Sequence, residues 1–249
     1  ELLAAAAERA NKPDYAIVNI RQAVSLRPRD VRLWRALAAV YSSSGHGPAA
    51  LAALERAAAL EPGDENTLRG LGELEMANHQ IGRGYKSLSR AVSLSPQDMR
   101  ARQDLGACAL GMGRPADADV QFNQVIAHEP NNAVVLAEAA ETRMMLNPSP
   151  TGLQDALTLA TRAAKIRPTA YSLTVLGRVC LARRSYTAAV LALKRALALP
   201  GFHPNAHVLL SQAYAALGDT NLSRQQSRLY QAATAEHTPH NATASSAGP

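Results

Sequence analysis

The sequence predicts an all-α protein built from repeated helical hairpins. Its composition favours helix over strand, because hydrophobic residues make up 47% of the chain while aromatic residues make up only 4%, and Ala and Leu dominate. Prolines also recur regularly, since Pro28, Pro62, Pro96 and Pro130 follow one another at intervals of 34 residues. Each of these prolines ends a similar helix-forming segment, and a proline at such a place fixes the exit from a helix.

The repeated segments read RQAVSLRP, ERAAALEP, SRAVSLSP and NQVIAHEP, and a fifth copy, TRAAKIRP, ends at Pro168. Each repeat has one slot for a small residue, which allows the two helices of a hairpin to approach closely. These small residues are Ala16, Ala50, Gly84, Ala118, Ala156 and Ala189. A second slot holds a large residue that fills the space beside them, namely Ile20, Leu54, Leu88, Phe122 and Leu193. Ala160 departs from this rule.

The order of residues within one period resembles the tetratricopeptide-repeat (TPR) family. Residues 31–64 supply most of the signature, with Trp34, Leu37, Ala38, Tyr41, Ala50, Leu54, Ala57 and Pro62. The resemblance covers nearly the whole chain and implies a right-handed superhelical solenoid of helix-turn-helix repeats, with about thirteen or fourteen helices.

The repeat register predicts the domain organisation. One array is expected over 1–237, with a partial repeat at 1–30 and fuller repeats at 31–64, 65–98, 99–132, 133–169 and 170–203. Residues 204–237 read as a divergent, capping repeat, because the second helix is polar as the end of a solenoid requires. Residues 238–249 are polar and small and are expected to be a flexible tail. The chain opens at Glu1 inside a helix-like segment, so we expect the N-terminus to be truncated.

Two kinds of connection are expected between the helices. Gly45, Gly113 and Gly218 fall in tight turns, where a positive φ is often required. The interval of 38 residues before Pro168 predicts an enlarged loop over 147–152. That loop is interpreted either as a tolerated surface insertion or as a partner contact.

The bulk properties restrict the function only weakly. The formal charge is +6, nearly all of it from Arg, and the two cysteines, Cys108 and Cys180, lie two repeats apart. We therefore expect both thiols to be buried packing residues rather than a disulfide. No segment is apolar enough to span a membrane, and no signal peptide is visible. Cytoplasmic and periplasmic locations both remain open.

No constellation of residues predicts catalysis. The chain lacks a GxxxxGK phosphate loop, an HExxH helix and a GxSxG turn. His46 and His79 fall near neighbouring turns, and His203 and His207 are four residues apart, but two histidines make a poor metal site. We expect no enzymatic activity, no cofactor and no metal.

The family resemblance places a partner-binding surface on the concave face, which the first helices of the hairpins build. The register assigns to it the candidate partner-binding residues Arg32, Arg35, Arg69, Glu73, Met76, Arg100, Leu110, Glu141, Met144, Met145, Tyr171, Arg178 and Leu181. Arginines in the N-terminal half, where acidic residues are few, are suited to carboxylates. The Met and Leu stripe is suited to an adaptable apolar groove. The alternative interpretation of the arginines is a solvated face, and that of the Met and Leu stripe is packing between hairpins. The lattice of the chaperone-binding clamps is incomplete, because Ala39 and Gly70 replace its asparagines.

The leading functional hypothesis is a protein-interaction scaffold that binds a peptide or partner protein on the concave face. The expected ligand has acidic groups at one end and apolar anchors at the other. Two alternatives are a substrate-selecting repeat region of a larger enzyme, such as a glycosyltransferase, and a periplasmic superhelix of a polysaccharide-export system. Nucleic-acid binding is disfavoured, because aromatic residues for base stacking are scarce. The partner and the oligomeric state stay undetermined.

Overall fold

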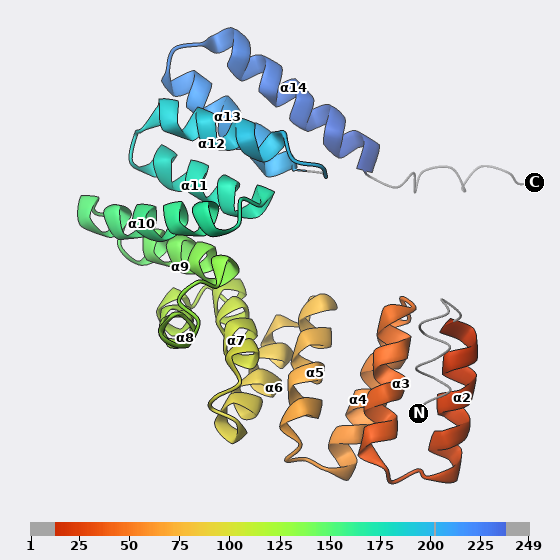
Figure 1. Ribbon diagram of the computed structural model, residues 1–249. Helices are drawn as coiled ribbons and strands as arrows, with labels where there is room; N and C mark the ends of the chain where they lie inside the picture. The colour runs from red at the N-terminus through yellow and green to blue at the C-terminus, as the bar shows by residue number, and fades with distance from the viewer. Residues whose placement is uncertain (1–12, 202, 238–249) are drawn as a thin grey trace, which may run out of the picture. The chain divides into compact units, whose positions relative to one another are not determined.

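The computed structural model describes residues 13–201 and 203–237, which form thirteen helices and no strand (Figure 1). This confirms the prediction of an all-α chain. The start of the predicted partial repeat and the predicted flexible tail lie outside the described residues. The chain divides into two compact units, residues 1–128 and residues 129–249.

Each unit consists of antiparallel hairpins, in which a first helix packs against the second helix that follows it. The first helices are α3 (Val31–Ser43), α5 (Glu65–Ala77) and α7 (Met99–Gly111) in unit 1, and α9 (Ala133–Leu146), α11 (Ala170–Ala182) and α13 (Pro204–Ala216) in unit 2. The second helices are α4 (Gly47–Leu60), α6 (Ile81–Leu94), α8 (Pro115–His128), α10 (Pro150–Ile166), α12 (Tyr186–Leu197) and α14 (Thr220–His237). The helix α2 (Pro13–Leu26) packs on α3 and has the place of a second helix.

Acidic or amide side chains start the first helices at the same repeat position. Asp30, Asp64, Asp98 and Asn132 are the N-caps of α3, α5, α7 and α9. The side chain of each accepts a hydrogen bond from a backbone N–H in the first turn, at 2.9–3.2 Å. Such a cap satisfies a donor that the helix itself leaves unpaired.

The turns within the hairpins confirm the expectation for the glycines. Gly45, Gly113 and Gly218 have φ values of 75°, 69° and 82°. Two other turns place His79 and Arg184 in the same left-handed region, with φ values of 59° and 60°. Side chains seldom adopt this conformation, so these turns are held by the packing of their helices.

Close approach of the helices depends on glycines that face large side chains. A Cβ atom added to Gly72 would lie 2.4 Å from the Cγ atom of Leu88, and one added to Gly106 would lie 2.5 Å from a ring carbon of Phe122. Gly177 faces Leu193 in the same way, at 2.5 Å. The large residue of each pair therefore occupies the volume that the missing side chain leaves.

The hairpin of α9 and α10 follows a different size rule. It has Ala140 at the position of these glycines and Ala160 at the position of the large residues, and both are fully buried. The exchange is reciprocal, because the first helix gains a methyl group where the second helix loses a larger side chain. The smaller side chain of Ala160 in α10 is thus offset by the larger side chain of Ala140, which replaces glycine in α9.

The extra residues of this repeat lengthen its helices and do not enlarge its loop. The turn between α9 and α10 spans residues 147–149, and the equivalent turn between α7 and α8 spans 112–114. Instead α9 has 14 residues and α10 has 17, whereas α7 has 13 and α8 has 14. The predicted enlarged loop over 147–152 is therefore wrong. Ser149 caps α10 by accepting from the N–H of Gly152, which places Pro150 in the first helical turn, where proline is well tolerated.

Both cysteines are free and buried, as expected. Burial raises the pKa of the Cys108 thiol to about 11, with Asp104 and Glu75 adding to the shift. Burial also raises the pKa of the Cys180 thiol. Both side chains therefore stay protonated and serve as packing residues.

The small-residue slot can be tested at Ala50, which is fully buried in α4. We expect Ala50→Leu to overpack this hairpin and to lower the free energy of unfolding by roughly 1–3 kcal/mol. Thermal and urea unfolding followed by circular dichroism measure the change. An unchanged melting temperature would show that this position has room for a larger side chain.

Candidate partner-binding face

The first helices of unit 1 border an open cavity between α3 and α5. It has a volume of about 470 Å³. Its apolar lining includes Ala39, Leu54 and Gly70, and its polar rim includes Arg32 and Glu73. An apolar side chain of a partner could enter it, with charged groups beside it to fix the orientation of the bound segment.

Small residues open this cavity. Ala39 is exposed on α3, and Gly70 on α5 has no side chain to cover the floor. A Cβ atom added to Gly70 would lie 3.1 Å from the Cδ1 atom of Leu54. At these two positions, where chaperone-binding clamps have asparagines, the surface is thus a hollow rather than polar.

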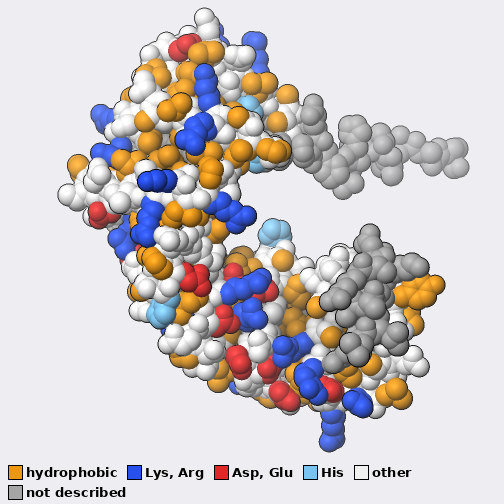
Figure 2. All heavy atoms as spheres, viewed as in Figure 1, with side chains coloured by type: hydrophobic (Ala, Val, Ile, Leu, Met, Phe, Trp, Pro, Cys, Tyr) orange, Lys and Arg blue, Asp and Glu red, His pale blue; other side chains and the backbone are white. Residues whose placement is uncertain are grey.

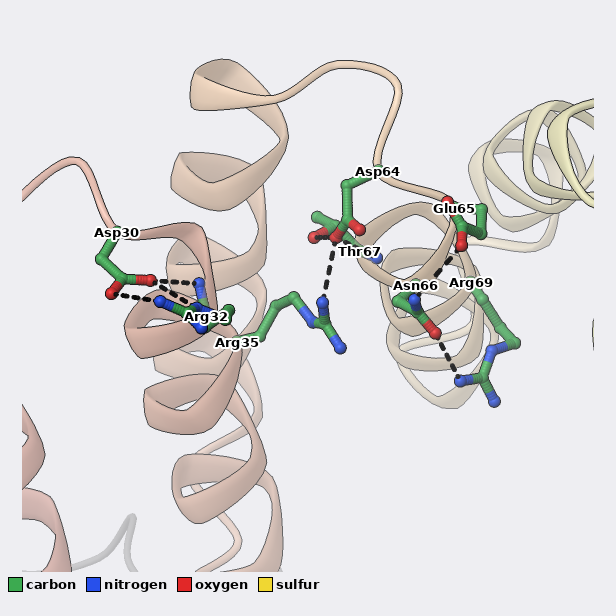
Figure 3. A network of polar contacts seen from close by, with 8 residues as sticks. All are labelled: Asp30, Arg32, Arg35, Asp64, Glu65, Asn66, Thr67 and Arg69. Atoms are coloured by element: carbon green, nitrogen blue, oxygen red, sulfur yellow. Dashed lines mark hydrogen bonds and ion pairs between the residues drawn. The ribbon is translucent and has the colours of Figure 1, made fainter. Parts of the chain in front are cut away.

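Two arginines of this face pair with the N-cap of the next first helix. The Nη1 atom of Arg35 lies 3.4 Å from the Oδ2 atom of Asp64, and the Nε atom of Arg69 lies 3.2 Å from the Oδ2 atom of Asp98. Figure 3 shows Arg35 extending from α3 toward Asp64, at the start of α5. Each arginine therefore joins its own hairpin to the next one.

A second set of ion pairs joins α5 to α7. The Oε1 atom of Glu73 lies 3.6 Å from the Nη1 atom of Arg69 and 3.2 Å from the Nε atom of Arg100. The expectation that acidic residues are few around these arginines is therefore wrong, and Figure 2 shows basic and acidic side chains interleaved on the visible face of unit 1. Repeat counting missed the aspartates that cap the helices beside these arginines.

The exposure of the arginines separates those that hold hairpins together from those within reach of a ligand. The side chains of Arg35 and Arg69 are 36% and 26% exposed, whereas those of Arg32 and Arg100 are 78% and 70% exposed. Arg32 pairs with Asp30 of its own cap and Arg100 pairs with Glu73. Since exposed ion pairs are weak, Arg32 and Arg100 can exchange their partner for a ligand carboxylate at little cost.

Asp104 on α7 is a half-buried carboxyl group next to this cluster. Its Oδ2 atom is buried and accepts no hydrogen bond from the described part of the chain. Burial, with the carboxylate of Glu73 as the second cause, raises the pKa of Asp104 to about 6, although Arg100 and Arg69 act in the opposite direction. The first-helix face of unit 1 therefore has one group that titrates near neutral pH.

The raised pKa predicts a specific dependence of stability on pH. Below about pH 4 Asp104 is protonated in both states, and between about pH 4 and 6 only the unfolded chain releases the proton. The contribution of this group to the free energy of unfolding thus falls as the pH rises through this range. We expect Asp104→Asn to raise the melting temperature by about 3–5 °C at neutral pH and to have little effect near pH 4. A difference from wild type that does not change with pH would contradict this assignment.

In unit 2 the first helices α9 and α11 are joined by a network around Glu141. The hydroxyl group of Tyr171 donates to the Oε2 atom of Glu141 at 3.0 Å, and Arg178 pairs with its Oε1 atom. Burial and the carboxylate of Glu141 raise the pKa of the Tyr171 phenol, which therefore remains a donor. Glu141, Tyr171 and Arg178, three of the predicted site residues, thus lie together and contact one another.

Apolar residues of this face differ in their surroundings. Met76 packs against the core of the α5–α6–α7 region, and Leu181 packs against the core of unit 2, so both are partly structural. Leu110 and Met144 are half-buried, and neither lines the α3/α5 cavity. Met145 and Tyr171 are 55% and 42% exposed. Part of the predicted stripe is therefore packing between helices.

The histidines have local partners. His46 contacts the ring of Tyr41 edge to face, with 6.1 Å between the ring centroids, and His79 forms one of the left-handed turns. His207 is hydrogen-bonded to Gln226 at 2.8 Å. Among the described residues, no group of three or more His, Cys, Asp or Glu side chains is placed to hold a metal ion. In the same part of the chain, no helix has both the length and the hydropathy to cross a membrane.

A tetratricopeptide-repeat family profile matches residues 31–74. This match covers the repeat in which the signature is clearest, and the described residues of the chain are helical hairpins throughout. The described part of the chain thus has the fold of tetratricopeptide-repeat proteins.

Solved structures share this fold. A chain of the APC/C hetero-tetramer Cut9-Hcn1 superposes with a TM-score of 0.76 and 15% identity, over 94% of this chain and 46% of that one, so this chain spans about half of its length. TTC0263, a thermophilic TPR protein of Thermus thermophilus, has a TM-score of 0.62 and 21% identity, over 70% of this chain and 93% of that one. YrrB, described as a TPR protein with an unusual peptide-binding site, has a TM-score of 0.59 and 15% identity, with coverages of 84% and 97%. Among curated proteins no sequence matches this chain.

Proposed function

We propose that this TPR protein is a non-enzymatic scaffold that binds an extended segment of a partner protein on the first helices of unit 1. An apolar side chain of the segment occupies the α3/α5 cavity, and a neighbouring carboxylate contacts Arg32 or Arg100. The fold supports the general part of this proposal, because TPR arrays are typical of protein-interaction scaffolds.

The α3/α5 cavity is the observation that carries the proposal. It combines an apolar lining with a charged rim, and its volume of about 470 Å³ is large enough for a leucine or an aromatic side chain. Anchors that fill such pockets contribute most of the binding energy of an interface. The exposed arginines act mainly on the rate of association and on its dependence on salt.

This geometry gives the predicted binding residues different roles. Arg35 and Arg69 hold adjacent hairpins together, so Arg35→Glu with Arg69→Glu is expected to loosen unit 1 as well as to weaken binding. Arg32 and Arg100 are the better probes of the charged contact. The exposed Met145 of unit 2 is proposed as a separate apolar contact, together with the ring of Tyr171.

The experiment starts from peptides displayed on phage and selected on the full chain. The proposal expects enriched peptides to share one bulky apolar residue next to an acidic residue. Ala39→Trp places a large side chain at the mouth of the cavity and is expected to weaken these peptides at least about tenfold, since it removes the anchor site.

Ala77→Trp is the matched control, because Ala77 is an exposed residue near the end of α5 and is absent from the cavity lining. It should change the affinity less than about twofold, as expected outside an anchor site. Equal affinities of wild type and Ala39→Trp, with unchanged helicity, would contradict the proposal. So would enriched peptides that lack an apolar residue.

A further inference from the structure

The second helices carry two grooves on the opposite side of the hairpins. In unit 1, α2 and α4 both pack on α3 and leave a groove of about 500 Å³ between them. In unit 2, α10 and α12 both pack on α11 and leave a groove of about 280 Å³. Each groove lies entirely within one unit.

The two grooves use corresponding positions of the repeat. Leu37 of α3 and Leu176 of α11 form part of the two floors. The wall of each groove includes one buried alanine and one arginine at the same register. These residues are Ala53 and Arg56 in α4, and Ala192 and Arg195 in α12. The same surface is therefore built twice by the repeat.

The repeat that directly follows the α2/α4 groove shows what closes such a groove. At the position of Ala49 in α4 and of Ala188 in α12, helix α6 has Arg83. The Nη2 atom of Arg83 lies 2.8 Å from the Oε1 atom of Glu55 in α4, so this side chain crosses between the second helices α4 and α6. Alanine at the equivalent positions leaves the other two grooves open.

The chemistry of the grooves is apolar and basic. Trp34 and Tyr41 lie in the α2/α4 groove, and Leu191, which is 64% exposed, lies in the α10/α12 groove. Two arginines line each groove, and none of the described residues that line either one is acidic. The arginines are Arg21 and Arg56 in the α2/α4 groove, and Arg183 and Arg195 in the α10/α12 groove.

We propose that each groove binds an acidic amphipathic segment of a partner protein, with apolar side chains on the floor and carboxylates on the arginines. Charge complementarity selects this occupant, because two cations stand beside an apolar floor without acidic residues in the lining. A nucleic acid would require a longer basic track and stacking surfaces. This surface is independent of the first-helix face, so its test and the test of the proposed function have separate outcomes.

Trp34 provides a direct reporter, because it is the only tryptophan of the chain. The probe is a short helical peptide with leucines along one face and glutamates beside them, and its matched partner has lysines in place of the glutamates. The acidic peptide is expected to change the fluorescence of Trp34 with saturation, and calorimetry should give two sites per chain. The basic peptide should bind at least about tenfold more weakly.

Charge reversal at the grooves distinguishes specific binding from general attraction. Arg56→Glu should abolish the fluorescence change and reduce the stoichiometry from two sites to one, and Arg195→Glu added to it should remove the second site. Arg90→Glu is the control, because Arg90 is exposed on α6 at the same register as Arg56. An Arg90→Glu effect equal to that of Arg56→Glu would overturn the proposal. So would equal binding of the basic peptide, or tighter binding of a DNA oligonucleotide than of the acidic peptide.

Discussion

Replacing Gly106 by alanine is expected to destabilise unit 1 strongly. The new Cβ atom would lie 2.5 Å from one ring carbon of Phe122 and 2.9 Å from two others. Phe122 is fully buried, so its ring has no free space into which it can move. We expect the overlap to cost about 3 kcal/mol, of which better helix propensity returns about 1 kcal/mol. The measurement is urea unfolding of the full chain.

Gly82→Ala is the matched control for this change. Gly82 also lies in a helix, α6, but a Cβ atom added there would meet nothing within 4 Å. It should therefore raise the free energy of unfolding by about 0.5–1 kcal/mol. Equal effects of the two substitutions would show that helix propensity alone, and not the close approach of α7 and α8, determines the outcome.

Removing the charge of Arg83 is the second change with a large expected effect. The Nε atom of Arg83 lies 3.1 Å from the Oε1 atom of Glu75, whose side chain is only 3% exposed. The hydroxyl group of Ser87 donates to the other carboxylate oxygen at 2.7 Å. Arg83→Met keeps the aliphatic stem but leaves the buried carboxylate without its cation, so we expect the free energy of unfolding to fall.

The second partner of Arg83 supplies the control. Glu55 pairs with the same guanidinium group at 2.8 Å, but its side chain is 47% exposed. Glu55→Gln should therefore change the free energy of unfolding by less than about 0.5 kcal/mol. A larger loss for Glu55→Gln than for Arg83→Met would place the important contact on the surface rather than at the buried Glu75.

The repeating part of the fold was predictable because periodic residues have periodic physical roles. The small slot at Ala50, the large slot at Phe122 and the turn at Gly45 all follow from counting 34 residues. The caps have the same spacing, and a comparison of the repeats one position before each first helix would have revealed them. These caps are Asp30, Asp64 and Asp98.

Features that depend on pairs of residues were not predictable in this way. The four extra residues before Pro168 could enter either a loop or the helices, and only the packing of α9 and α10 decides for the helices. The pairing of Arg35 and Arg69 with the caps depends on the distance between successive hairpins, which repeat counting does not give. The partial burial of Asp104 and the cavity beside Gly70 likewise arise from several helices together.

Binding of a partner segment on α3 and α5 of unit 1 can be measured by hydrogen–deuterium exchange of the full chain, with and without a peptide selected on it. We expect slower exchange in Val31–Ser43 and Glu65–Ala77, and loss of that protection in Ala39→Trp but not in Ala77→Trp. Protection confined to the second helices, or protection that persists in Ala39→Trp, would contradict it.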